Sequence, residues 1–174
     1  MARRKTDRAG PEPVSAGPEF PPVEARISFL VHQINARIAQ VSNQLFRRHG
    51  IDVYSSRILV ILLERREVRI GELVGLMVLP QSTVSHQIQR LERRRLVRRR
   101  RTREDNRSVA VTLTPKGRLI AQECNGLSRA VYGAMTGVFS RSEIEELRGR
   151  LRTLFATLTR FGEEQSGEAA PPEP

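Results

Sequence analysis

The sequence predicts a mainly α-helical protein that contains one small β-hairpin. Apolar residues recur at three- and four-residue steps over most of residues 27–161, which is the period of helices that bury one face. The period changes to two around residues 97–113, and this change predicts two short strands joined as a hairpin. With 174 residues and 39% hydrophobic content, the chain is large enough to form one domain with a core.

The two ends of the chain differ in composition from the middle. Residues 1–22 contain five prolines and few apolar residues, and residues 163–174 are acidic, small and proline-rich. Neither stretch can bury enough apolar surface to order itself, so we expect disordered tails on either side of a domain formed by residues 23–162. The sequence has no apolar run of membrane-spanning length and no signal-peptide pattern, so we expect a cytoplasmic protein that does not enter the membrane.

The helices before the hairpin are separated by residues that stop or start a helix. Gly50 can take the left-handed conformation that follows a helix end, and Ser55 or Ser56 is the expected N-cap of the next helix. Pro80 separates the third helix from the fourth, because the residue before a proline is pushed out of the helical region. The four expected helices cover about residues 27–45, 55–66, 70–78 and 81–94.

Two further helices are expected after the hairpin. Thr114 and Pro115 suit the N-cap and the first position of a helix that reaches Met135. Ser140 and Glu143 have the spacing of a capping box, which starts a sixth helix with an apolar stripe over residues 144–161.

The net charge of +11 is concentrated in one segment of the chain. Residues 90–107 hold ten arginines against three acidic residues, a net charge of +7. This density favours a binding site for a polyanion, although an isolated charge run is also typical of a solvated helix face.

The fourth helix shows which kind of polyanion fits. Projection at about 100° per residue places Val84, Ile88 and Leu91 on one side of this helix. The opposite side carries small, amide and basic residues, namely Ser82, His86, Gln89 and Arg93, with Arg90 flanking them. A short helix, a tight turn and a helix with such a polar side are typical of a protein that reads the major groove of double-stranded DNA. Amide side chains reach base edges there, and arginines hold phosphates or guanine.

The basic hairpin predicts a second contact with DNA. Its tip is "TREDNRS", in which Asp105 lies two residues before Arg107 and is able to orient that guanidinium by a charge-assisted hydrogen bond. An arginine held in this way suits a narrow minor groove.

The run "IGELVGLMVLPQSTVSHQIQRLERRRLVRRRRTREDNRSVAVTLTPKG" resembles the winged helix-turn-helix of the MarR family of bacterial transcription regulators. The motifs "STVS", "RLE", "LV", the wing "D-x-R" and "LTPKG" occur in the family's order and spacing. The resemblance implies a winged helix-turn-helix over about residues 52–114, which we call the reading head. It also implies long dimerisation helices over about residues 23–49 and 115–162, and a homodimeric repressor on a palindromic operator.

Two residues depart from the family pattern. Arg95 stands where the family usually has glycine, so a left-handed backbone there would be strained by roughly 1 kcal/mol. Val78 occupies a place that a turn glycine or a polar residue often holds.

The residues expected to contact DNA lie on the fourth helix and on the hairpin. They are Gln81, Ser82, Thr83, Ser85, His86, Gln89, Arg90, Arg93, Arg99, Arg101, Arg103, Asp105 and Arg107. MarR family members commonly release DNA when a small, often aromatic, carboxylic acid binds between the dimerisation helices and the reading head. The polar residues that the resemblance suggests for such an effector site are His32, Asn35, Tyr54 and Arg57.

The apolar surface predicts a homodimer independently of the resemblance. The stripes over residues 27–45 and 144–161 each extend for about five turns, which is more than the reading head can cover. Self-association around a two-fold axis would bury these stripes and place both reading heads on one side of the duplex. The two half-sites are then expected about 10 base pairs apart.

Enzymatic, metal and cofactor functions have no support in the sequence. The three histidines fall in separate elements, and neither a glycine-rich phosphate loop nor a nucleophile motif occurs. The single cysteine, Cys124, excludes a metal cluster built on thiolates and lies among apolar positions, which favours packing over a redox role. A dimerisation scaffold and an RNA-binding or ribosome-associated protein are the alternatives. The RNA alternative predicts aromatic residues in the basic segment, and residues 90–107 contain none.

Overall fold

The computed structural model describes residues 20–101 and 109–167, and it confirms a mainly α-helical fold with a small antiparallel sheet. The chain divides after Ile38 into two compact units, and α1 begins in the first unit and continues into the second. Within the described ranges the helices are α1 (Ile27–Phe46), α2 (Val53–Arg65), α3 (Ile70–Met77), α4 (Gln81–Arg93), α5 (Pro115–Thr136) and α6 (Arg141–Ser166). The strands are β1 (Glu67–Arg69), β2 (Val97–Arg101) and β3 (Val109–Leu113), and two 3-10 turns cover Val23–Ala25 and Arg47–His49.

Three of the expected helix boundaries are confirmed by their caps. Gly50 adopts the left-handed conformation with φ of 59° just beyond the first helical segment. Thr114 caps α5, where its hydroxyl accepts a hydrogen bond from the Gly117 N–H at 2.9 Å. Ser140 and Glu143 form the capping box of α6, and the Ser140 N–H donates to the Glu143 carboxylate at 2.7 Å.

Two expected boundaries were wrong. The N-cap of α2 is Asp52, whose side chain accepts a hydrogen bond from the Ser55 N–H at 2.7 Å, so this helix begins before the predicted serine caps. The serines are buried inside the first turn, and their hydroxyls bond elsewhere. Residues 163–166 were assigned to the tail but continue α6, which ends where Gly167 turns left-handed with φ of 67°.

The hairpin predicted from the two-residue period is strands β2 and β3, and it lies in a three-stranded antiparallel sheet of order β1-β3-β2. Strand β1 was not predicted, since three residues are too few to show a period. Val68 of β1 and Arg99 of β2 both pair with Val111 of β3, so these positions share one face of the sheet. Both valines are buried, and the inner face therefore closes the core of the reading head.

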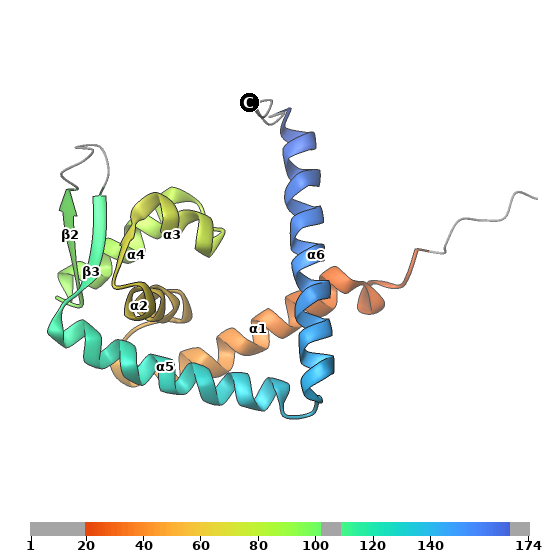
Figure 1. Cartoon of the computed structure of the whole chain (residues 1–174), viewed down its shortest axis with the longest axis horizontal. Helices are drawn as coiled ribbons and strands as arrows, with labels where there is room; N and C mark the ends of the chain where they lie inside the picture. Colours follow the sequence, from red (N-terminus) through yellow and green to blue (C-terminus); the bar gives the residue numbers. More distant parts are fainter. Residues whose placement is uncertain (1–19, 102–108, 168–174) are drawn as a thin grey trace, which may run out of the picture. The chain divides into compact units, whose positions relative to one another are not determined.

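The core of the second unit is built around α2. Figure 1 shows α2 lying between α5 and the α3–α4 pair, with the β2–β3 hairpin beside them. The fully buried apolar residues of this core come from all of these elements. They include Ile58, Leu59, Leu62, Leu73, Val84, Ile88, Leu91 and Val111. The first turns of α5 complete this core through Ala121 and Cys124, whose burial agrees with the packing role expected for the cysteine.

The glycine of the "LTPKG" motif, Gly117, is required for steric reasons. A Cβ atom added to Gly117 would lie 1.8 Å from the carbonyl oxygen of Leu96, which follows α4. The Thr114 N–H donates to the same carbonyl at 3.0 Å, and the Thr114 hydroxyl donates to the Arg95 carbonyl at 2.7 Å. The end of α4 and the start of α5 thus touch backbone to backbone, and only glycine permits that approach.

Both departures from the family pattern lie in left-handed backbone. Val78, in the turn between α3 and α4, has φ of 50°, and Arg95, directly after α4, has φ of 59°. Side chains with a Cβ are strained there by about 1–2 kcal/mol. The strain predicted at Arg95 is therefore present in the fold.

Candidate nucleic-acid interface

Helix α4 is held in place by its apolar side. Val84, Ile88 and Leu91 are fully buried against the core, as their spacing predicted. Helix α3 and a short turn at residues 78–80 precede α4, which gives the helix-turn-helix arrangement. Because the apolar side is buried, the opposite side of α4 faces solvent.

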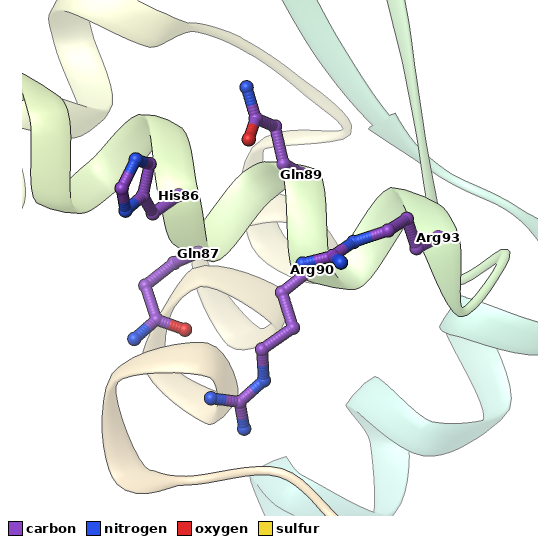
Figure 2. A pocket seen from close by; sticks show the side chains of 5 residues that line it. All are labelled: His86, Gln87, Gln89, Arg90 and Arg93. Carbon is purple, nitrogen blue, oxygen red and sulfur yellow. The ribbon is translucent and has the colours of Figure 1, made fainter.

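The exposed side of α4 carries four polar residues at helical spacing, Ser82, His86, Gln89 and Arg93, which we call the α4 ridge. All four are exposed, and no side-chain hydrogen bond or ion pair joins any of them to another described residue. Figure 2 shows the Gln89 side chain pointing away from the side of α4 on which Gln87 and Arg90 lie. The ridge therefore presents hydroxyl, imidazole, amide and guanidinium groups outward, and these are the groups that bind base edges and phosphates in a major groove.

The surface is hollowed where the ridge meets the flank of α4 that carries Gln87 and Arg90. A pocket of about 310 Å³ is lined by His86, Gln87, Gln89, Arg90 and Arg93, all from α4 (Figure 2). The two arginines give its wall a positive charge. A pocket of this kind can accept an anionic group.

The remaining residues predicted on α4 lie at its N-terminal end. Gln81 is exposed, whereas Thr83 and Ser85 are half-buried. The N-terminal end of a helix carries unpaired backbone N–H groups and a positive dipole, and these favour contact with phosphate.

Gln87 and Arg90, on the flank of α4, point toward the start of α2 (Figure 2). Arg90 Nη1 lies 3.1 Å from Asp52 Oδ2, and Gln87 Nε2 donates to the same oxygen at 3.4 Å. The Ser55 hydroxyl donates to Gln87 Oε1 at 2.9 Å. Arg90 was predicted to contact DNA from the flank of the polar side, and the structure provides its guanidinium with a carboxylate partner within the protein.

The Asp52 carboxylate is held in its charged form. Burial raises its pKa, but hydrogen bonds from Ser55, the positive charge of Arg90 and a hydrogen bond from Gln87 together outweigh burial, so the pKa of Asp52 lies below its usual value. At neutral pH the contact with Arg90 is therefore an ion pair.

A second link was also missed by the sequence reasoning. The Arg94 guanidinium donates to the backbone carbonyls of His49 and Gly50, just before α2. Gln87, Arg90 and Arg94 recur at steps of three and four, which is a helical face, but their partners lie 32 to 45 residues away. Sequence spacing on α4 alone could not reveal those partners.

The wing residues divide into three groups. Arg99 forms an ion pair with Glu92 of α4 at 2.6 Å, and Arg101 is exposed without an ion-pair partner among the described residues. Arg98 and Arg100 were not predicted and lie on the opposite face of β2, where Arg100 pairs with Glu67 at 3.3 Å. The predicted residues Arg103, Asp105 and Arg107 lie outside the described residues.

The residues suggested for an effector site fall in different units. His32 and Asn35 are exposed on the first-unit part of α1, and the His32 ring lies 6.3 Å from that of Phe29. Tyr54 and Arg57 are exposed in the first turns of α2. Among residues 20–101 and 109–167 there is no group of three or more acidic, histidine or cysteine side chains arranged to hold a metal ion. The helices in that part of the chain are also too short or too polar to cross a bilayer.

Comparison with known proteins gives the family of this chain. The model of the SarA/Rot family of transcriptional regulators matches residues 40–124. The HTH-type transcriptional regulator MgrA of Staphylococcus aureus is 30% identical over 106 residues, which cover 61% of this chain and 71% of MgrA. The chain belongs to the MarR and SarA/Rot winged helix-turn-helix transcription regulators. This regulator is thus a DNA-binding protein of that type and not an enzyme, as its sequence predicted.

Solved structures confirm the fold of the regulator. A mutant MarR from Escherichia coli in complex with operator DNA matches with a TM-score of 0.65 at 19% identity, covering 74% of this chain and 92% of that one. BpsR of Bordetella bronchiseptica, solved in a study of how 6-hydroxynicotinic acid regulates its DNA binding, matches with a TM-score of 0.67 at 22% identity. That match covers 79% of this chain and 97% of BpsR.

Proposed function

We propose that this regulator is a homodimeric repressor that binds a palindromic operator in double-stranded DNA through the α4 ridge. The observation that carries the proposal is the two-sided character of α4, in which three apolar residues are fully buried and four polar residues are exposed opposite them. In this proposal Gln89 and His86 read bases, and Arg93 holds a phosphate or a guanine. Such a protein acts where the chromosome is, in the cytoplasm.

The dimer part of the proposal rests on α6 and on α1. Leu151, Phe155 and Leu158 of α6 are 49%, 56% and 60% exposed, although they lie on one face of a 26-residue helix. In the first unit, Ile27 and Ile34 of α1 are likewise exposed. Apolar surface of this extent is typical of a subunit interface. Two copies joined there would bring two α4 ridges to one duplex.

Sequence-specific binding is tested by selecting duplexes from a random library and measuring affinities by fluorescence anisotropy. Gln89→Ala should reduce discrimination at one base pair by about 1–3 kcal/mol and leave the affinity for random duplex unchanged. Gln122→Ala, at an exposed position on α5, is the matched control. An equal loss on every duplex after Gln89→Ala would contradict base reading by the α4 ridge.

Salt dependence reports the phosphate contacts of the same complex. Each phosphate neutralised by an arginine releases counterions, so six to ten such contacts per dimer should lower the affinity by about 10³–10⁵ between 50 and 200 mM salt. An affinity that hardly changes over this range would contradict a surface that holds the DNA backbone.

The proposed effector is a small aromatic or carboxylate molecule. Support comes from BpsR, whose DNA binding is regulated by an aromatic carboxylic acid. The candidate residues are His32 and Asn35 in the first unit and Tyr54 and Arg57 in the second, all of them exposed. Titrating a panel of aromatic acids into the regulator–operator complex should release the DNA. The absence of binding at millimolar concentration would remove the effector from the proposal.

A further inference from the structure

One flank of α4 is bonded to residues 49–55, which comprise the end of the segment that joins α1 to α2 and the first turn of α2. Gln87, Arg90 and Arg94 occupy successive turns of that flank, and each bonds to a residue between His49 and Ser55. The α4 ridge lies on the neighbouring flank. The orientation of the ridge relative to DNA therefore depends on where residues 49–55 hold α4.

Asp52 is the residue at which the two helices meet. Its Oδ1 atom accepts the Ser55 N–H at 2.7 Å and caps α2, while its Oδ2 atom accepts from Arg90 at 3.1 Å and from Gln87 at 3.4 Å. One carboxylate thus binds the start of α2 with one oxygen and the middle of α4 with the other. A shift of either helix would break one of these contacts.

The ion pair between Arg90 and Asp52 is a minor contributor to the stability of α4. The side chains of Arg90 and Asp52 are 42% and 29% exposed, and a partly exposed ion pair contributes little to the stability of the fold. The core beneath α4 is fully buried and dominates the stability of the helix. Loss of the contact should therefore leave α4 folded, so that its effect on DNA reading can be measured apart from stability.

Arg90 lies next to two residues of the α4 ridge. It follows Gln89 in sequence and lies one turn after His86, so a tilt or rotation of α4 that separates Arg90 from Asp52 also moves both ridge residues. Base contacts require side chains held within about half an ångström of their productive position. We propose that Asp52 is a positioning and specificity-determining residue, whose carboxylate anchors Arg90 and Gln87 so that the α4 ridge meets base edges at a fixed angle. This inference rests on the proposed function.

The decisive variant is Asp52→Asn. Asparagine caps helices as well as aspartate does when its single oxygen accepts the Ser55 N–H, but it places an N–H₂ group where Oδ2 accepted from Arg90 and Gln87 and removes the charge that holds Arg90. Affinity for the selected operator should fall about tenfold, the effect of one lost base contact, while affinity for random duplex is unchanged. Asp52→Ser also keeps a capping oxygen without charge and should behave in the same way. The midpoint of thermal unfolding should stay within a few degrees of the wild type.

A charge-matched control separates positioning from a general electrostatic effect. Glu146→Gln removes a carboxylate that pairs with Arg150 on α6 at 2.6 Å, and it changes the net charge by the same amount as Asp52→Asn. Operator selectivity of this control should equal that of the wild type. A loss of selectivity as large as that of Asp52→Asn would overturn the proposal.

A double-mutant cycle with Arg90→Gln tests the direct route. If Arg90 acts through Asp52, each single substitution reduces operator affinity similarly and the double variant is no worse than either one. If Arg90 instead binds a phosphate independently of Asp52, the losses add, and Arg90→Gln also weakens binding to random duplex and lowers the salt slope by about one. That result, or wild-type selectivity in Asp52→Asn, would overturn the role of Asp52. A wild-type protein that selects no duplex at all would overturn the proposed function, and this inference with it.

Discussion

The reading head and α6 use the same apolar period but end in opposite environments. In the reading head, Ile58, Leu62 and Ile88 are fully buried by neighbouring elements of the same chain. On α6, Leu151 and Phe155 recur at equivalent steps and remain about half exposed. The comparison shows that periodicity identifies the apolar face of a helix, whereas the cover for that face depends on the rest of the fold. For α6 the cover proposed here is a second copy of the chain.

The largest effect is expected from disrupting the close packing between the end of α4 and the start of α5. Gly117→Ala would place a Cβ 1.8 Å from the Leu96 carbonyl oxygen, so the junction of α4 and α5 would have to move. We expect a loss of about 3 kcal/mol or more in the free energy of unfolding, measured by urea denaturation. Gly126→Ala on the same helix, where a Cβ meets nothing within 4 Å, should be neutral or stabilise by up to about 1 kcal/mol. Equal effects of the two substitutions would show that the backbone approach is absent.

The second prediction concerns the proposed dimer interface on α6, which can be disrupted without changing the reading head. The double substitution Leu151→Glu and Phe155→Glu places two charges on the apolar face, where burying each side chain contributes about 1.5–3 kcal/mol. The dimer dissociation constant should rise at least a hundredfold in sedimentation analysis. Circular dichroism should show a folded protein.

The control for this double variant lies on the same helix. Thr153→Glu puts a charge on the opposite side of α6, where the position is exposed, and should leave the dimer intact. If the wild type sediments as a monomer at every concentration, the proposed cover is wrong.

Local features of the fold could be predicted from the sequence, whereas contacts between distant residues could not. The buried and exposed sides of α4, the Thr114 cap and the capping box of α6 depend on residues within a few positions of one another. The contact between Asp52 and Arg90 joins residues 38 positions apart, and no local pattern encodes it. The N-cap of α2 was misplaced for a related reason, because serine and aspartate are equally good caps and only the three-dimensional contacts decide between them.

A smaller effect sharpens the account of strain next to α4. Arg95 has φ of 59°, so Arg95→Gly relieves a conformational cost of about 1–2 kcal/mol, partly offset by the greater freedom of glycine in the unfolded chain. We expect a net stabilisation of about 0.5–1 kcal/mol in urea denaturation. Arg95→Ala keeps a Cβ and should give no gain, and a stabilisation as large as that of glycine would point to removal of charge instead.

The smallest expected effect is the pH dependence contributed by Asp52. Because its folded-state pKa lies below the unfolded value, its contribution to stability is fully present above the unfolded pKa and is lost as the pH falls through the folded pKa. Stability of the wild type and of Asp52→Asn should therefore differ by a constant amount between pH 5 and 8 and converge in more acidic solution. A difference that widens toward low pH would contradict the direction of this pKa shift.

The central claim is that two α4 ridges read one duplex from the same side. A hydroxyl-radical footprint of the wild-type protein on its selected duplex tests this claim most directly. The account predicts two protected segments related as an inverted repeat, about 10 base pairs apart and on one side of the helix. A single protected segment, or protection that is the same on every duplex, would contradict it.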